Sequence, residues 1–442
     1  MENTQPTSWK FPSRFWIANA MELMERAAYY GFFIVLTLYL TDIVGFTDIE
    51  TGIIAGVFSA GVYFFPPFSG TFVDKIGFKN GLIIAFGLLT IGYFFLGIFT
   101  TKLMVIILLI ILMVGASFIK PLITGTVAKT TNEINRARGF SLFYWVVNIG
   151  AFSGKTVVPY IRQGLGLEHV NFFSSGMAFL ALLFALFVFK DVKEDTKGKS
   201  LKEVWEGLVR IFTKGRLIAL TLIVSGFWLI QGQLYATMPK FVIRLQGEEA
   251  KPEWLANVNP LVVVIFVVLI TQLMRKKQAV NSIFVGMLIM PLSALAMAFS
   301  NILGSQAINV FGLFNMHPLT FMMIVGIALQ GLAECFISPR FLEYFSLQAP
   351  KGEEGLYMGF SHLHSFFSYI IGFVMSGFLL DSYCPDPTTL PAGLTEVQRM
   401  AYYADAHYIW YYFVGIGLLA AIALFVFKIV IKKIDAKKNL QV

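Results

Sequence analysis

Two carboxylates and a guanidinium stand together near the start of the chain, inside its first long apolar segment. The stretch from Glu22 to Gly31 reads ELMERAAYYG. On a helix Glu22 and Arg26 share a face because they are four residues apart, and so do Glu25 and Tyr29. Ionised groups at bilayer depth are costly unless they pair or face water. This face is therefore either a structural ion pair that locks two helices together or a site that handles protons and a substrate.

Five more polar residues fall inside apolar segments. Lys120 lies too far from either end of its segment to reach water easily, which predicts a role in substrate or proton handling. Glu334 invites the same interpretation. Lys155 either reaches the outer membrane interface or faces a central cavity. Asn148 and Asn259 either hydrogen-bond to neighbouring helices or line that cavity.

Two further pairs are expected to be peripheral. Arg340 and Glu343 are three residues apart, which predicts an interfacial ion pair. His362 and His364 stand near the start of an apolar segment, where we expect them to cap a helix or face solvent.

The composition places these residues in a membrane protein. Of 442 residues, 57% are hydrophobic and only 14% are charged, and the mean hydropathy is +0.72. A soluble domain of this size needs more charge on its surface. Residues 1–13 are polar and the first apolar run is long, so no cleavable signal peptide is expected. Two cysteines indicate no disulfide framework.

Apolar windows of about 20 residues recur along the chain, and each is long enough to cross a bilayer core. They predict an all-α membrane protein with twelve transmembrane helices. The expected spans are approximately 14–41, 49–73, 80–99, 103–128, 139–163, 171–190, 216–239, 254–274, 280–300, 319–346, 356–380 and 408–431. Lys and Arg concentrate in the loops that follow the even-numbered spans and in the C-terminal tail. The loop at 41–49, after the first span, has none. By the positive-inside rule, both termini are expected to be cytoplasmic.

A charged stretch divides the spans six and six. We expect an N-terminal half at 1–190, a cytoplasmic linker at 191–215 and a C-terminal half at 216–442. The linker is expected to form a short amphipathic helix on the membrane surface. Its apolar face would comprise Leu201, Val204, Trp205, Leu208 and Phe212.

Two six-helix halves joined by a long basic loop are the organisation of the major facilitator fold. The loop after the second span, GTFVDKIGFKN from Gly70 to Asn80, resembles the signature of that superfamily. The resemblance implies a structural and gating role for Asp74.

Eight fragments in order narrow the resemblance to the proton-coupled oligopeptide transporters. Glu22–Gly31 is similar to that family's ExxERFxYYG motif, with Ala27 in place of the aromatic residue. The other fragments are YFFPPFSGTFVD, FIKP, FYWVVNIGAFSG, FWLIQGQ, NPLVVVIF, AECFISPRFLEYFSLQAP and MGF. The match covers both halves, and the chain would be a divergent member.

The resemblance implies roles for named residues. Proton coupling would involve Glu22, Glu25 and Glu334. A pairing of Lys120 with Glu334 would act as a cytoplasmic-side gate. Substrate would meet Arg26, Tyr29, Tyr30, Tyr63, Lys120, Asn148, Lys155, Trp228, Asn259 and Glu334.

The departures from the family pattern are also informative. Phe33 stands where the family usually has an arginine, and Gly232 stands where it has a glutamate. Those two residues can pair across the family's outer gate, so losing both leaves no orphaned charge. Lys155 has no counterpart in the family pattern and adds a positive charge.

The predicted function is proton-coupled symport of short peptides or peptide-like solutes by alternating access. An exporter or uniporter of another organic solute, anionic solutes included, on the same scaffold stays open, as does a ligand sensor that does not transport. No enzyme, cofactor, metal or nucleic-acid partner is expected, because no nucleophile elbow, metal-ligand spacing or phosphate loop occurs. The expected location is a bacterial inner membrane, with the protein acting as a monomer.

Overall fold

The computed structural model describes residues 10–131, 135–190, 200–301, 306–310, 312–348, 357 and 360–439. Within that part the chain forms two compact units. The first comprises residues 1–45 and 61–205, and the second comprises residues 46–60 and 206–442. Helix α2 crosses this division, because its opening residues pack in the second unit and its remainder belongs to the first.

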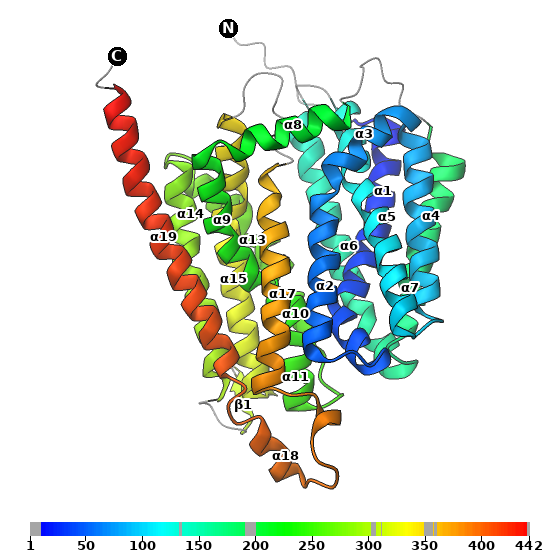
Figure 1. Ribbon diagram of the computed structural model, residues 1–442, viewed down its shortest axis with the longest axis vertical. Coiled ribbons are helices and arrows are strands. Elements are labelled where there is room, and N and C mark those ends of the chain that lie inside the picture. Colours follow the sequence, from blue (N-terminus) through cyan, green and yellow to red (C-terminus); the bar gives the residue numbers. More distant parts are fainter. Residues whose placement is uncertain are drawn as a thin grey trace. The chain divides into compact units, whose positions relative to one another are not determined.

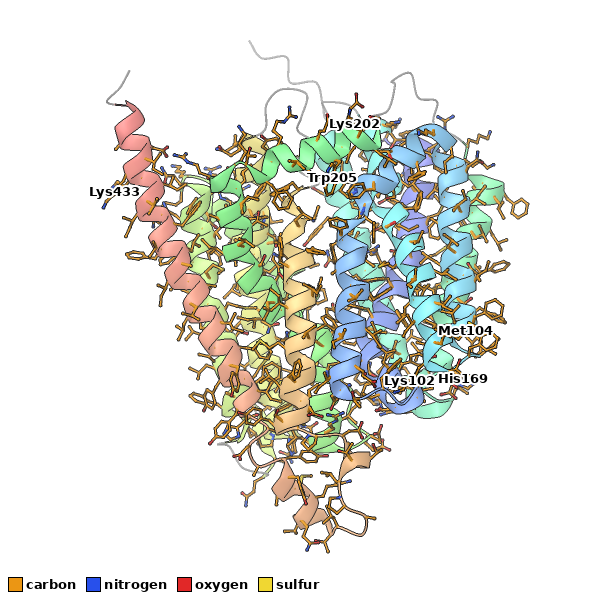
Figure 2. All side chains as sticks on the ribbon, viewed as in Figure 1. Lys102, Met104, His169, Lys202, Trp205 and Lys433 are labelled. Carbon is orange, nitrogen blue, oxygen red and sulfur yellow. The ribbon has the colours of Figure 1, made fainter. Side chains whose placement is uncertain are left out.

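The first unit is a bundle of apolar helices (Figure 1). Its elements are α1 (Ser13–Leu38) with a π turn (Tyr39–Ile43), the end of α2 (Asp48–Phe64), α3 (Pro66–Ile76), α4 (Phe78–Leu96), α5 (Lys102–Lys129), α6 (Arg136–Gly164) and α7 (His169–Leu183) with a π turn (Phe184–Val188). Pro66 cannot continue α2, and the chain bends by 47° between α2 and α3. Lys102 and His169 lie at one end of these helices, and Trp205 lies at the other end (Figure 2).

The second unit contains the remaining helices and one hairpin, except that residues 201–205 of α8 belong to the first unit. Its elements are α8 (Leu201–Phe212), α9 (Gly215–Gln231), α10 (Gln233–Ala236), α11 (Met238–Gln246), α12 (Pro252–Leu255), α13 (Val258–Met274), α14 (Ala279–Ala298), a 3-10 turn (Phe299–Asn301), β1 (Ile308–Val310), β2 (Phe314–Met316), α15 (Pro318–Gln348), α17 (Leu363–Tyr383), a 3-10 turn (Pro387–Thr389), α18 (Glu396–Tyr402) and α19 (Tyr408–Asn439). Strands β1 and β2 pair antiparallel, with Asn309 opposite Asn315. The hairpin and α18 lie at the end of this unit opposite the start of α9 (Figure 1).

The expected membrane spans coincide with these helices. Ten helices in the described part are long and apolar enough to cross a membrane, and the bent pair α2–α3 makes eleven. Helix α6 is 29 residues long but more polar, and it fills the remaining position. The all-α architecture with twelve spans is thereby supported. Helix α17 begins at Leu363, later than expected, and residues 349–356, 358 and 359 lie outside the described part.

Helix α8 occupies the middle of the stretch between the two sets of spans and runs across the direction of α9 (Figure 1). Residues 191–199 of that stretch lie outside the described part. Val204 and Leu208 of the expected apolar face are buried, whereas Leu201, Trp205 and Phe212 are exposed. A helix with apolar side chains both against protein and outward suits a position at a membrane surface.

Helices α1 and α6 approach each other closely in the first unit because α6 presents two glycines four residues apart. A Cβ on Gly150 would lie 2.7 Å from Cβ of Arg26, and one on Gly154 would lie 2.9 Å from Cα of Ala27. Small residues at this spacing let membrane helices pack backbone to backbone. This contact brings the α6 side chains alongside the charged turn of α1.

We expect Gly154→Ala to destabilise the protein, because the added methyl overlaps the carbonyl oxygen of Ala27 as well as its Cα. Overpacking of this kind costs about 1–3 kcal/mol. Thermal unfolding in detergent, followed by size-exclusion chromatography, would show a lowered Tm. The matched control is Gly176→Ala in α7, where an added Cβ meets nothing within 4 Å. Equal Tm values for the two variants would contradict the close packing of α1 on α6.

Candidate functional site

The charged turn of α1 is a buried ion cluster. Arg26 Nε lies 3.2 Å from Glu22 Oε1, and the same guanidinium also pairs with Glu25. All three side chains are buried inside a helix that is long and apolar enough to span a membrane. The shared face of Glu22 and Arg26 is therefore confirmed. One cation between two carboxylates leaves this turn with a formal negative charge when all three groups are ionised.

Tyrosines and a lysine extend this cluster along α1. The Arg26 guanidinium lies 5.5 Å from the ring centre of Tyr29 and 5.9 Å from that of Tyr30. Lys155 Nζ lies 5.8 Å from the Tyr30 ring centre, and its side chain is 1% exposed. Lys155 is thus buried rather than extended toward the protein surface. The Tyr29 hydroxyl is buried and has no hydrogen-bond partner among the described residues.

A proline positions Lys120 on α5. Pro121 lacks an N–H, which leaves the Ser117 carbonyl without its usual helical donor. The Ser69 hydroxyl of α3 donates to that carbonyl at 2.7 Å. Lys120 Nζ lies 3.8 Å from the ring centre of Tyr63. Ser69 is a positioning residue that the sequence analysis missed, because nothing in its own motif marks it.

Lys120 belongs to the same electrostatic neighbourhood as the α1 cluster. Its charge acts on Glu22, Glu25 and Arg26. The first unit therefore gathers two carboxylates and three cations, Lys155 included, among membrane-spanning helices. These groups sum to a formal charge of one positive unit when all are ionised, which favours an anionic group on a ligand.

Two other residues of the first unit, Asn148 and Asp74, were also expected to have functional roles. Asn148 is half-buried and donates a hydrogen bond to the Tyr144 carbonyl of its own helix at 2.8 Å. The side chain of Asp74 lies outside the described part of the chain. Their expected roles stay predictions.

In the second unit, α9 and α13 converge on a glutamate of α15. Gln231 Nε2 donates to Glu334 Oε2 at 2.5 Å, and Asn259 Nδ2 donates to the same oxygen at 3.3 Å. Gln231 is the last residue of α9, and Gly232, which keeps helical backbone angles, joins it to α10. The sequence analysis named Asn259 and Glu334 but missed Gln231. Its signal was a long polar side chain inside an apolar span.

An aromatic stack holds Trp228 one turn before Gln231. The His364 ring stacks on the Trp228 indole with centres 5.0 Å apart and an angle of 8°, and Phe341 packs edge-on against the same imidazole. The expectation that His364 caps a helix or faces solvent is wrong, because its side chain is buried between these rings. His362 is exposed.

The expected ion pair of α15 forms, and it also caps a helix. Arg340 Nη1 lies 2.6 Å from Glu343 Oε2. Arg340 Nη2 donates to the Met274 carbonyl at 3.2 Å and to the Lys277 carbonyl. A guanidinium at the carboxyl end of α13 satisfies carbonyls that the helix leaves open.

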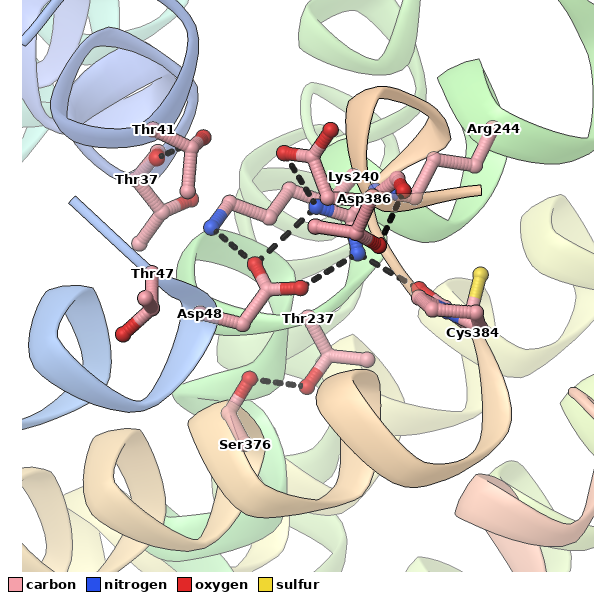
Figure 3. Close-up of polar contacts among 12 residues, drawn as sticks. Thr37, Thr41, Thr47, Asp48, Thr237, Lys240, Arg244, Ser376, Cys384 and Asp386 are labelled. Carbon is pink, nitrogen blue, oxygen red and sulfur yellow. Dashed lines mark hydrogen bonds and ion pairs between the residues drawn. The ribbon is translucent and has the colours of Figure 1, made fainter. Parts of the chain in front are cut away.

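A second buried ion cluster joins the start of α2 to α11, and the sequence analysis did not foresee it (Figure 3). Arg244 donates to both Asp48 carboxylate oxygens, at 2.7 and 3.0 Å, and Lys240 donates to Asp48 Oδ1 at 2.6 Å. Arg244 also donates to the Cys384 carbonyl at 2.5 Å and to Asp386 at 3.4 Å. Three separate regions of the sequence supply the charged residues, so no local sequence motif predicts this cluster.

The opening turns of α2 pack closely on α17 beside this cluster. A Cβ on Gly377 would lie 3.0 Å from Cα of Ile49, and one on Gly52 would lie 3.1 Å from Cα of Gly377. Glycines at both faces let the helices touch and bring Asp48 within reach of α11.

The expected pairing of Lys120 with Glu334 stays a prediction. Lys120 belongs to the first unit and Glu334 to the second, and each has the neighbours described above within its own unit.

Comparison with curated proteins finds relatives of two kinds. The chain is 29% identical over 170 residues to "Dipeptide and tripeptide permease A" of Edwardsiella piscicida, covering 37% of this chain and 34% of that protein. It is 27% identical over 235 residues to "Dipeptide and tripeptide permease B" of Aliivibrio fischeri, covering 51% and 46%. It is 21% identical over 360 residues to "Multidrug resistance protein MdtH" of Photorhabdus laumondii, covering 80% and 84%. The chain thus spans between a third and a half of the length of these two peptide permeases.

Solved structures share the fold over nearly the whole chain. A crystal structure of the POT family transporter PepTSo matches with a TM-score of 0.73 and 18% identity, covering 96% of this chain and 99% of that one. A POT family transporter in complex with 5-aminolevulinic acid matches with a TM-score of 0.74 and 17% identity, covering 96% and 97%. These likenesses confirm the expected fold.

The family model of the Major Facilitator Superfamily matches residues 18–317. That match covers more than half of the 442 residues and includes spans from both units. The protein is therefore an integral membrane protein with a transporter fold, and the chain belongs to the Major Facilitator Superfamily.

Proposed function

We propose that this protein is a secondary active transporter that couples protons to the uptake of short peptides or peptide-like solutes. The observation that carries the proposal is the buried set of ionisable groups in the first unit. Ionisable groups inside membrane helices are costly, and they mark proton and substrate pathways. The named peptide permeases and the likeness to peptide transporters support the same substrate class.

The two α1 carboxylates are the proposed proton carriers. Glu22 and Glu25 share the single guanidinium of Arg26. A substrate carboxylate that pairs with Arg26 or Lys120 offsets the positive charge that otherwise stabilises the ionised forms of Glu22 and Glu25. Their affinity for protons then rises, because a carboxylate that loses its cation is harder to ionise. Binding of substrate and proton thereby favour each other.

The second unit is proposed to hold the amino end of the substrate. Glu334 supplies the negative charge for an ammonium group, and Asn259 orients the carboxylate by hydrogen bonding. The remaining pocket residues, as the resemblance implies, are Tyr29, Tyr30, Tyr63, Asn148 and Trp228. Alternating access would come from movement of the two halves about the bound substrate.

The Asp48 cluster is proposed as the outer gate in place of the family's missing arginine–glutamate pair. Phe33 and Gly232 cannot form that pair. Asp48, Lys240 and Arg244 instead hold the start of α2 against α11. We propose that opening toward the outer side breaks this cluster.

Further expectations follow from the superfamily. The protein is expected to lie in a bacterial inner membrane with both termini in the cytoplasm and to act as a monomer. Its partners would be the peptide, protons and the surrounding lipid.

Export of another organic solute is the second candidate. The multidrug resistance protein matches this chain over a larger share of both proteins than the peptide permeases do. Uptake of labelled dipeptide into proteoliposomes, with and without an inward proton gradient, separates the candidates. A symporter accumulates peptide only with the gradient, and a uniporter only equilibrates it. An exporter of another solute and a non-transporting sensor do neither.

We expect Glu22→Gln and Glu25→Gln to lose gradient-driven accumulation while keeping exchange. Each change removes a proton-binding site but preserves the size of the side chain beside Arg26. Counterflow of labelled against unlabelled dipeptide without a gradient should survive better than concentrative uptake. Normal gradient-driven accumulation in both variants would show that neither carboxylate carries the proton.

Lys155 is expected to favour acidic peptides. Its buried charge lies beside Tyr30, and a charge of this kind contributes up to a few kcal/mol over several ångströms at an effective dielectric of about 20. We expect acidic dipeptides to compete for binding better than lysine-containing ones, and Lys155→Ala to narrow the difference. The assay must hold pH and salt fixed. Equal competition by both peptide types, unchanged in Lys155→Ala, would contradict this.

We expect Asp48→Asn to loosen the outer gate, because it leaves the cations Lys240 and Arg244 facing each other. Removing one partner of a buried ion pair costs about 3–5 kcal/mol. A cysteine at Thr51, one turn further along α2 and buried, reports opening by its rate of labelling with an impermeant maleimide. We expect labelling to become several-fold faster in Asp48→Asn.

The control for this experiment is Asp435→Asn, which breaks the more exposed pair with Arg216 and should change little. The native Cys384 should not react, because it is buried and burial raises its thiol pKa to about 12. A lowered Tm with unchanged labelling would mean that the cluster is structural and does not act as a gate.

A further inference from the structure

Helix α19 is longer than a bilayer requires. Its 32 residues extend about 48 Å at a rise of about 1.5 Å per residue, whereas a hydrocarbon core is about 30 Å thick. Only 28% of its most apolar window is buried against protein, so the rest of that window is available to lipid. The position of α19 along the bilayer normal therefore decides which of its polar residues reach the headgroups.

Aromatic side chains at the start of α19 indicate that position. Tyr408, Tyr411 and Tyr412 are exposed, and exposed tyrosines of membrane helices concentrate at the membrane interface. Lys432 follows Tyr412 by 20 residues, which is about 30 Å along a helix. Lys432 and Lys433 are therefore expected at the opposite interface, at the level of the lipid headgroups. Both are exposed, and Figure 2 shows Lys433 directed away from the neighbouring helices.

The end of α19 carries an excess of positive charge. Asp435 is the only acidic residue in the sequence between 408 and 442, and it pairs with Arg216 at the start of α9. Its charge is thereby offset by a residue outside α19. The positive charges of Lys428, Lys432 and Lys433 are left in excess at this end of the helix.

Helix α14 packs antiparallel against α19. A Cβ on Gly417 of α19 would lie 3.0 Å from Pro291 Cγ of α14. Further along α19, the ring centre of Phe425 lies 6.0 Å from that of Phe284, and Lys428 Nζ lies 5.2 Å from the same Phe284 ring centre. The start of α14 therefore lies toward the end of α19.

This arrangement adds a second group of cations to the first. Lys432 is one turn beyond Lys428, and α14 starts about one turn before Phe284, so the start of α14 lies beside Lys432. The loop that leads into α14 carries three exposed cations, which are Arg275, Lys276 and Lys277. Exposed apolar side chains continue along α19 from the lysines, and they are Ile422, Phe425, Val426 and Ile429. Cations at headgroup level beside an apolar helix face suit a ligand with a negatively charged head and acyl chains.

We propose that the end of α19 and the start of α14 bind an anionic phospholipid. Its phosphate group would lie among Lys432, Lys433 and the loop before α14, and its acyl chains would follow the exposed face of α19. The inference does not depend on the proposed transport function. The binding is electrostatic in part, so it should favour anionic over zwitterionic headgroups and weaken as salt is added.

Two lipids with the same short acyl chains test the proposal on the purified protein in a mild non-ionic detergent. Dioctanoyl phosphatidylglycerol is anionic, and dioctanoyl phosphatidylcholine is zwitterionic. Native mass spectrometry measures the bound lipid, and thermal unfolding measures the shift in Tm that binding produces. We expect phosphatidylglycerol to bind about tenfold more tightly and to raise the Tm more, because several cations surround its phosphate.

The double variant Lys432→Gln, Lys433→Gln removes two charges from exposed side chains. We expect its affinity for phosphatidylglycerol to fall about tenfold, with phosphatidylcholine binding and the lipid-free Tm unchanged. Lys432→Arg with Lys433→Arg keeps the charges and should keep the affinity. The matched control, Lys75→Gln with Lys202→Gln, removes two charges from exposed lysines of the first unit and should leave the affinity unchanged.

Four results would overturn the proposal. Equal affinity of the wild-type protein for the two lipids would show that the site does not select charge. Unchanged phosphatidylglycerol affinity in the Lys432→Gln, Lys433→Gln variant would show that these lysines do not contact the headgroup. An equal loss in the control variant would mean that overall surface charge attracts the lipid. Displacement of phosphatidylglycerol by an equal concentration of inorganic phosphate or glycerol 3-phosphate would mean that the site binds a soluble anion and not a lipid.

Discussion

The structure depends on how charged side chains are accommodated inside apolar helices. An isolated charge at bilayer depth is too costly to keep, so each one must find a partner or a ligand. Glu22, Glu25 and Arg26 meet this constraint within a single turn of α1, and Asp48 meets it with Lys240 and Arg244. These two clusters are the proposed proton site and the proposed outer gate.

Backbone features bring the charged groups together. Gly150 and Gly154 let α6 approach α1. Pro121 leaves the Ser117 carbonyl of α5 without a helical donor, so the Ser69 hydroxyl of α3 can donate to it. Gly377 and Gly52 likewise let the start of α2 approach α17 beside Asp48. Glycine and proline residues, whose side chains are not polar or charged, thus determine which polar and charged side chains come into contact.

The two units contribute different chemistry to the proposed transport cycle. The first carries a surplus of positive charge from Arg26, Lys120 and Lys155, which suits a carboxylate. The second carries Glu334 with Gln231 and Asn259 hydrogen-bonded to it, which suits the ammonium group in that proposal.

The sequence by itself determined the class of protein, the spans, and the local pairs. Hydropathy of about 20-residue windows reports membrane helices directly, and a spacing of three or four residues is enough to place Glu22 beside Arg26 and Arg340 beside Glu343. Only the tertiary structure decided which distant residues meet. The Asp48 cluster and the burial of His364 between Trp228 and Phe341 escaped prediction. Such contacts depend on helix packing, and packing depends on the shapes of whole helix faces, which no short stretch of sequence encodes.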